Sequence, residues 1–164
     1  MQPQALTGRK DALTARPLAE LLACPPDTGK LLNGAASCVD FEAGAVVFRQ
    51  SDASKGLYVA VSGHFLRRAE RLATRLTLGP VRVGDLFELA AVLGDGRHTY
   101  TLTAQTPGSA LLLPMDALLQ AFQQYPPLRM QLLEELAREV SRAYGTCCLS
   151  RTTRTRPRDL RAQL

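Results

Sequence analysis

The residues that could do chemistry gather in one stretch, Gly84 to Ala104, which reads GDLFELAAVLGDGRHTYTLTA. It holds a carboxylate, Glu88, and two basic side chains further along, Arg97 and His98. A glycine- and aspartate-led turn opens the stretch, and a Gly94-Asp95-Gly96 hinge divides it. A buried phosphate needs a planar cationic donor and free backbone amides, and a sugar hydroxyl needs an acceptor. The stretch therefore has the layout of a phosphate-binding segment.

The elements around this stretch must hold it in place, and their pattern is that of short strands. From Cys38 to Leu113 the apolar residues recur mostly at every second position, with Gly, Pro or Asp at short intervals. Many short strands at this spacing favour an antiparallel barrel or jelly roll. After Pro114 the apolar spacing becomes helical. The predicted fold class is therefore mainly β with flanking helices: an antiparallel β jelly roll followed by a long C-terminal helix.

Proline and glycine positions set the expected helix limits. We predict short helices at 17–23 and 30–37 with a loop at 25–29 between them, then helices at 115–124 and 127–144. Gly145 is the expected stop of the last helix. The domain boundaries follow: a flexible N-terminus at 1–16, one domain at 17–145, and a basic tail at 146–164 that is alternatively the start of a further domain.

The last predicted helix carries a possible pairing surface. Its apolar residues follow the 3-4-3-4 spacing of a coiled-coil seam, at Leu133, Leu136, Val140, Ala143 and Cys147. The spacing predicts a homodimer through the Pro127–Tyr144 helix, and it brings the two Cys147 thiols of such a dimer together. A single amphipathic helix that lies on its own barrel would show a similar pattern.

The charge of the chain is concentrated at one end. The net charge is +5, and residues 141–164 hold six arginines against one acid, Asp159, so the remainder of the chain is neutral. A basic arm suits an acidic partner such as nucleic acid. The alternative is a solvated, disordered end. No apolar run approaches the length of a membrane span and the N-terminus lacks a secretory signal, so we expect no membrane and a cytoplasmic protein.

The sequence contains no pattern that indicates a metal site or a catalytic motif. The four cysteines form no C-x-x-C pair, and the histidines number two, His64 and His98. The chain contains neither a G-x-S-x-G motif nor a Walker phosphate loop. We therefore expect no metal, no certain cofactor and no enzymatic activity.

The order of these parts resembles the cyclic-nucleotide-binding domain of the Crp–Fnr regulators over roughly residues 31–145. The residues that carry the resemblance are Gly44 before Phe48, Leu57-Tyr58-Val59, Ser62-Gly63, Gly84-Asp85-Leu86-Phe87, Ala104 and Pro114. The resemblance implies a pocket built from the middle stretch. Its effector-pocket candidates are Gly84, Phe87, Glu88, Leu89, Ala90, Arg97, His98, Thr99 and Tyr100.

The family's cassette typically reads Phe-Gly-Glu-Leu-Ala, followed by an arginine and two small residues. The glutamate holds the ribose hydroxyl and the arginine pairs with the cyclic phosphate. An ungapped count from Phe87 places Glu88 at the glycine, Leu89 at the glutamate and His98 at the arginine. Thr99 and Tyr100 then fall where small residues are usual. This alignment predicts weak or no binding of a cyclic nucleotide, because a neutral histidine cannot replace a guanidinium as a two-pronged partner.

A one-residue gap gives the other alignment. It returns Glu88 to the glutamate position and brings Arg97 to about the distance of the arginine, which keeps a cyclic nucleotide as a ligand. We favour the ungapped alignment, because the gap changes the register on both sides of the cassette.

The resemblance implies a dimeric sensory domain of a transcription regulator, with an effector that is not the usual cyclic AMP. A DNA-reading helix-turn-helix module should follow the long helix, and residues 158–164 could begin it. DNA would then bind through that missing module or through the basic tail. The alternative is a stand-alone interaction module with no small ligand, in which the cassette is filled by its own side chains. A pocket plugged by Tyr100 would favour this alternative.

Overall fold

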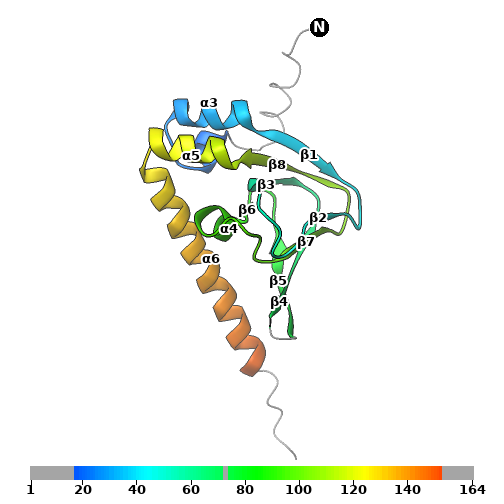
Figure 1. Cartoon of the computed structure of the whole chain (residues 1–164). Coiled ribbons are helices and arrows are strands. Elements are labelled where there is room, and N and C mark those ends of the chain that lie inside the picture. Colours follow the sequence, from blue (N-terminus) through cyan, green and yellow to red (C-terminus); the bar gives the residue numbers. More distant parts are fainter. Residues whose placement is uncertain (1–16, 72–73, 153–164) are drawn as a thin grey trace, which may run out of the picture.

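A computed structural model describes residues 17–71 and 74–152; the side chains of 71–80 and 143–152 lie outside the description. The described part contains eight strands and five helices (Figure 1). The strands are β1 (Ser37–Phe41), β2 (Val46–Phe48), β3 (Gly56–Ser62), β4 (Phe65–Arg71), β5 (Thr74–Val81), β6 (Leu86–Phe87), β7 (Thr101–Ala104) and β8 (Gly108–Pro114). The helices are α2 (Leu18–Leu21), α3 (Pro26–Ala35), α4 (Leu89–Leu93), α5 (Met115–Gln124) and α6 (Pro127–Thr152).

The strands form two antiparallel sheets, which confirms the predicted jelly roll with flanking helices. One sheet has the order β1-β8-β3-β6 and the other β2-β7-β4-β5. The helices α3 and α5 lie beside each other against the first sheet, and α4 lies between the roll and α6 (Figure 1). The cassette segment connects β6 of one sheet to β7 of the other, so it closes the roll on the side that faces α6.

Strand β3 explains how one sheet serves two cores. Six of its residues in a row are buried, because alternate side chains point to opposite faces of a sheet. Leu57 and Val59 pack into a core shared with the helices. Tyr58 and Ala60 pack into the interior of the roll, which is rich in aromatic rings. Where both faces of a sheet are covered, its strands have a continuous apolar sequence, as Leu57 to Val61 does.

The N-terminal helices differ from the prediction mainly at the second helix, which was expected at 30–37 and is observed as α3 (Pro26–Ala35), with Ser37 already in β1. The short helix expected at 17–23 is present as α2. The loop expected at 25–29 is wrong, because α3 already begins at Pro26. Proline suits the first turn of a helix, where its missing N–H would have no partner in any case. Gly29 then lies inside α3, and it allows close packing: a Cβ there would stand 2.6 Å from the Cβ of Ala19.

Helix α6 is longer than the sequence predicted. Its backbone continues through Gly145 to Thr152, so the predicted stop at Gly145 is wrong. A glycine inside a helix costs only about 1 kcal/mol relative to alanine, and no proline follows before Pro157. The predicted flexible N-terminus, residues 1–16, lies outside the described residues. Of the predicted basic tail, 146–164, residues 146–152 belong to α6 and residues 153–164 lie outside the description.

The two halves of α6 have different surroundings. Leu128 and Leu132 are buried in the helical core, and Leu136 packs against the same core. Further along, Val140 is 59% exposed, and the helix runs past α4 and extends beyond the strands at its lower end (Figure 1). The side chains of Ala143 and Cys147 lie outside the description. One face of the helix therefore packs against its own domain, and part of another face is exposed to solvent.

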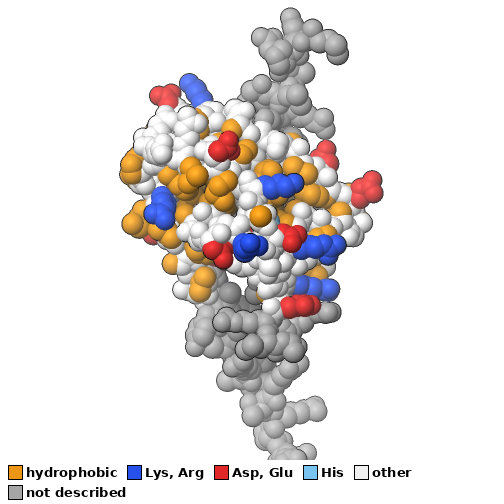
Figure 2. All heavy atoms as spheres, viewed as in Figure 1, with side chains coloured by type: hydrophobic (Ala, Val, Ile, Leu, Met, Phe, Trp, Pro, Cys, Tyr) orange, Lys and Arg blue, Asp and Glu red, His pale blue; other side chains and the backbone are white. Residues whose placement is uncertain are grey.

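The surface carries a mixture of charges. Lysine, arginine, aspartate and glutamate side chains are spread over the visible face, with apolar side chains between them (Figure 2). Within residues 17–71 and 74–152 there is no helix that combines the length and the hydropathy needed to cross a membrane.

Candidate functional site

The site begins at Glu88, the residue between β6 and α4. Its backbone is left-handed, with φ 78° and ψ 25°, a conformation that costs a residue with a Cβ about 1–2 kcal/mol and that favours glycine. Its carbonyl accepts a hydrogen bond from the N–H of Val92, 3.0 Å away, which starts α4. Its own N–H donates to the hydroxyl of Tyr100 at 3.2 Å. Glu88 thus has the backbone of the glycine that the ungapped alignment places here.

The side chain of Glu88 forms a buried pair with His98. Its Oε2 lies 2.6 Å from His98 Nδ1, and the two residues are 2% and 4% exposed. The other carboxyl oxygen, Oε1, is buried and has no hydrogen-bond partner among the described residues. A buried charge without full pairing is costly. The environment therefore favours the state in which both side chains are neutral and one proton lies between them.

Burial shifts the pKa of both members of this pair toward neutrality. It raises the pKa of Glu88 to about 8; the Thr99 amide opposes that shift and the negative charge of Glu139 adds to it. Burial lowers the pKa of His98, with partial compensation from the charge of Asp52. The desolvation of charged groups dominates in each case.

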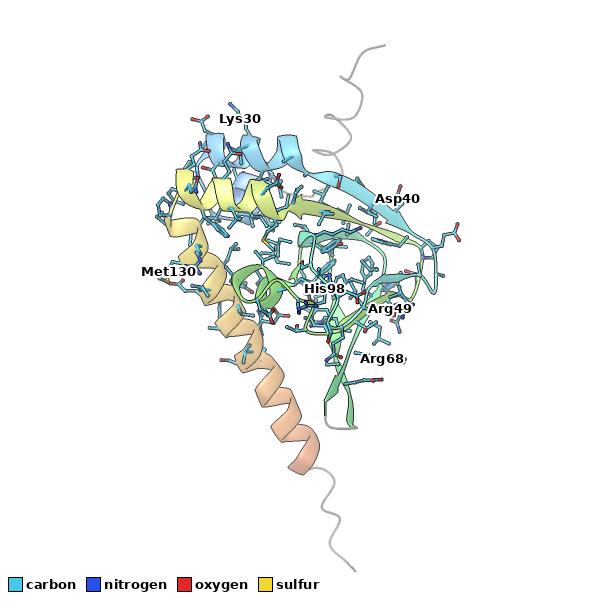
Figure 3. All side chains as sticks on the ribbon, viewed as in Figure 1. Lys30, Asp40, Arg49, Arg68, His98 and Met130 are labelled. Carbon is cyan, nitrogen blue, oxygen red and sulfur yellow. The ribbon has the colours of Figure 1, made fainter. Side chains whose placement is uncertain are left out.

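An aromatic face and a short loop fix the ring of His98. The ring stacks on Phe48, with 3.9 Å between the ring centroids and 4° between the planes. The His98 backbone exchanges hydrogen bonds with the loop after β2: its N–H donates to the Asp52 carbonyl at 2.9 Å, and its carbonyl accepts from the Ser51 N–H at 2.8 Å. Figure 3 shows His98 within the roll, close to α4.

Tyr100 fills the space beside the pair. It is 6% exposed, and its ring centroid lies 5.6 Å from that of Phe48. Burial raises the pKa of its hydroxyl far above the ordinary value, with a further contribution from the negative charge of Glu88. The hydroxyl thus stays protonated and holds the Glu88 backbone in place. Tyr100 occupies the interior of the roll as part of its core.

A cation on β4 extends this group toward α6. The guanidinium carbon of Arg67 lies 5.7 Å from the centroid of the Tyr100 ring, within the range of a cation–π contact. Arg67 also forms an ion pair with Glu139 of α6. The two side chains are 16% and 28% exposed, so the pair is partly shielded from solvent. It connects the second sheet directly to the long helix.

The remaining predicted pocket residues lie in several environments. Phe87 is fully buried in the roll, and Gly84 forms a turn with φ 87°. Leu89 is 1% exposed and packs into the helical core. Ala90 is half-buried and Thr99 is exposed. The structure thus brings Glu88, His98 and Tyr100 together and turns Leu89 away from them.

Arg97 faces outward. Its Nη1 donates to the Ser51 carbonyl at 2.9 Å, and its backbone N–H donates to Asp95 Oδ1 at 3.0 Å. The side chain is exposed, and its hydrogen bond to Ser51 helps to hold the loop after β2.

Three members of the site were missed from the sequence: Phe48, Arg67 and Glu139. They lie far along the chain from Glu88. Phe48 belongs to the pattern that carries the family resemblance, but nothing in that pattern places it at the site, and no motif marks Arg67 or Glu139. The alternating pattern of β4 could have indicated that Arg67 faces inward, but it could not supply the partner on α6. Among the side chains that the structure describes, those of residues 17–70 and 81–142, no three His, Cys, Asp or Glu cluster in a way that could hold a metal ion.

Comparison with known proteins identifies the family. The sequence pattern of the cyclic nucleotide-binding domain matches residues 38–125, more than half of the chain. The chain therefore belongs to the cyclic nucleotide-binding domain family, which confirms the resemblance seen in the sequence. No curated protein matches the chain in a sequence search.

Solved structures with this fold include sensor domains of transcription regulators. The sensor domain of the regulator DNR from Pseudomonas aeruginosa is 23% identical with a TM-score of 0.64, over 79% of this chain and 91% of that one. The catabolite activator protein of Thermus thermophilus is 23% identical with a TM-score of 0.67, over 82% of this chain and 62% of that one. The N-terminal domain of a Streptomyces coelicolor A3(2) transcriptional regulator is 24% identical with a TM-score of 0.58, over 83% and 94%. At these identities the likeness establishes the shared fold.

Proposed function

We propose that this chain is the sensory domain of a Crp–Fnr type transcription regulator, and that it does not bind cyclic AMP or cyclic GMP through the family's glutamate and arginine. The observation that carries the proposal is the Glu88–His98 pair. It stands where the ungapped alignment expects the phosphate site, and it is buried with both side chains engaged with each other.

The chemistry of the pair does not suit a cyclic phosphate. A phosphate needs a cation with several donors, and an acidic side chain repels it. Here the basic partner is an imidazole, already bonded to a carboxyl group. Arg97, the cation of the gapped alignment, donates to Ser51 instead, and Leu89 lies in the helical core. The left-handed backbone of Glu88 supports the ungapped alignment, because that position suits the family's glycine.

The open face of α6 supports a dimer. Met130 and Val140 are 60% and 59% exposed, and Leu133 between them is half-buried. Figure 3 shows Met130 on the side of α6 away from the roll. The residues are spaced three and seven apart, as on one face of a helix. We propose that a second copy covers this face. Leu136 of the predicted seam packs into its own domain, so it contributes less to such a contact than Leu133 and Val140.

A specific observation also favours an interaction module with no small ligand. Tyr100 lies in the interior of the roll and bonds the Glu88 backbone, so the cassette is occupied by its own side chain. In that case the protein partner or nucleic acid would be recognised elsewhere, for example by the basic tail. Both proposals share the prediction that cyclic nucleotides do not bind.

Titration calorimetry of the purified chain with cyclic AMP and cyclic GMP tests this prediction. We expect no binding heat up to about 1 mM nucleotide, which corresponds to less than about 4 kcal/mol of binding free energy. Arg97→Ala is the matched variant, because it removes the cation of the gapped alignment from an exposed position. Micromolar binding that Arg97→Ala abolishes would overturn the proposal and restore Glu88 and Arg97 as a nucleotide site.

A further inference from the structure

A continuous path of contacts leads from the buried pair to the long helix. The N–H of Glu88 donates to the hydroxyl of Tyr100 at 3.2 Å. The ring of Tyr100 faces the guanidinium of Arg67 at 5.7 Å. Arg67 in turn pairs with Glu139 of α6. The path runs from the residue between β6 and α4, through the residue before β7, to β4 and α6. None of these links joins neighbours in the sequence.

From this arrangement we propose that the Glu88–His98 pair is a proton switch for α6. While the pair holds one proton, Arg67 stays paired with Glu139 and keeps the helix against the roll. When the pair loses that proton, the contact between β4 and α6 weakens. The inference goes beyond the proposed sensory role and rests on it only in taking α6 as the element that carries the response.

The charge balance of the neighbourhood gives the physical reason. Without its proton, Glu88 is a buried carboxylate with one unpartnered oxygen, and such a group strongly attracts a cation and repels an anion. Arg67 is the cation on this path and Glu139 is the anion. A negative Glu88 therefore draws Arg67 inward and pushes Glu139 outward. The titratable and charged groups that act on the pair are Asp52, Tyr58, Tyr100 and Glu139, and Arg67 acts on Tyr100.

The direction of the pH effect follows from the proton count. The folded carboxyl of Glu88 keeps its proton up to about pH 8, whereas an unfolded glutamate loses it near 4.5. Unfolded His98 takes up a proton below about 6.5, and the folded imidazole resists it. Below pH 6.5, and above both 4.5 and the lowered pKa of folded His98, the folded and the unfolded pair each hold one proton. Between 6.5 and 8 the folded pair holds one more, so stability from this pair falls as the pH rises.

Carbon-detected NMR of the glutamate side-chain carboxyls in the full chain tests the switch directly. We expect the Glu88 carboxyl to titrate with a midpoint near pH 8. Hydrogen exchange of the α6 amides, corrected for the intrinsic pH dependence of exchange, should lose protection over the same pH range. Each pKa unit of coupling between the proton and the helix contact corresponds to a tenfold change in protection. Glu88→Gln should remove this pH dependence, because glutamine keeps the size of the side chain without titrating.

Two variants of α6 separate the switch from a general charge effect. Glu139→Gln removes the partner of Arg67, so the Glu88 midpoint should move to lower pH and α6 should lose protection at all pH values. Glu134→Gln changes an exposed glutamate of the same helix and should alter neither. A Glu88 midpoint below pH 6 in the unaltered chain would overturn the switch, and so would a midpoint near 8 with unchanged exchange in α6. Either result could occur with or without nucleotide binding, so failure of the switch is distinguishable from failure of the proposed function.

Discussion

Tyr100 is the residue that holds the cassette in its observed shape. Its hydroxyl accepts the hydrogen bond of the Glu88 N–H, at a residue whose left-handed backbone is unfavourable for glutamate. Its ring fills the interior beside Phe48. The ungapped alignment places Tyr100 at a position that is small in the family, so one large side chain supplies both the filling and the hydrogen bond.

Replacing Tyr100 with phenylalanine tests this role. Tyr100→Phe keeps the ring and leaves the buried N–H of Glu88 without its acceptor, which should lower the free energy of unfolding by about 1–3 kcal/mol. Urea denaturation at pH 7 measures the loss. Tyr125→Phe is the matched control, because Tyr125 is half-buried at the end of α5 and the described contacts include no hydrogen bond of its hydroxyl. Equal losses in the two variants would contradict the role of Tyr100.

Turns between strands set the geometry of the roll at the scale of elements. Gly63 joins β3 to β4 with φ 89°, and Gly84 precedes β6 with φ 87°. Both need the left-handed backbone that glycine adopts without strain. They differ in their surroundings, because a Cβ on Gly63 would lie 2.7 Å from the Cα of Gly108, whereas a Cβ on Gly84 would meet open space. Gly63 therefore also allows the β3–β4 turn to approach the start of β8.

The two glycines form a matched pair for mutation. Gly84→Ala should cost about 1–2 kcal/mol of unfolding free energy, the cost of a left-handed alanine. Gly63→Ala should cost about 1–3 kcal/mol more, because the added methyl group displaces the backbone of Gly108. Thermal and urea unfolding of both variants give the comparison. If Gly84→Ala lowered the stability as much as Gly63→Ala, the close approach of Gly63 to Gly108 would not be what makes Gly63 necessary.

At the scale of the whole molecule, α6 is the described helix that reaches beyond its own core. The first turns of α6 are buried through Leu128 and Leu132, whereas Val140 remains exposed and the helix runs on to Thr152. A single exposed apolar side chain is normal on a protein surface, but several on one helix face favour contact with a partner. The proposed dimer would cover Val140 and Leu133 while leaving the roll unchanged.

Charge introduced on this face should separate the copies. Val140→Glu places a carboxylate opposite its own counterpart in a symmetric dimer, so sedimentation velocity should show a monomer where the unaltered chain sediments as a dimer. Leu119→Glu is the control, since Leu119 is 53% exposed but lies on α5. A dimer that survives Val140→Glu and dissociates with Leu119→Glu would place the contact on α5 instead.

The sequence alone determined the strand-rich roll, the helix at 115–124 and the family, because these depend on local period and on the order of turns. The order of turns also aligned the chain with the family's cassette, which made Glu88, His98 and Tyr100 candidates for the site. It misjudged the start of α3 and the end of α6, where proline and glycine are compatible with more than one structure.

Only the tertiary structure decided which candidates meet. Arg97 and His98 are neighbours in the sequence, yet His98 points into the roll and Arg97 points out of it, since adjacent side chains in an extended segment face opposite ways. Phe48, Arg67 and Glu139 join the site through contacts between strands and helices that are distant in the sequence. The same packing excludes water from Glu88 and His98, and that burial gives an ordinary carboxyl group and an ordinary imidazole their altered proton affinities.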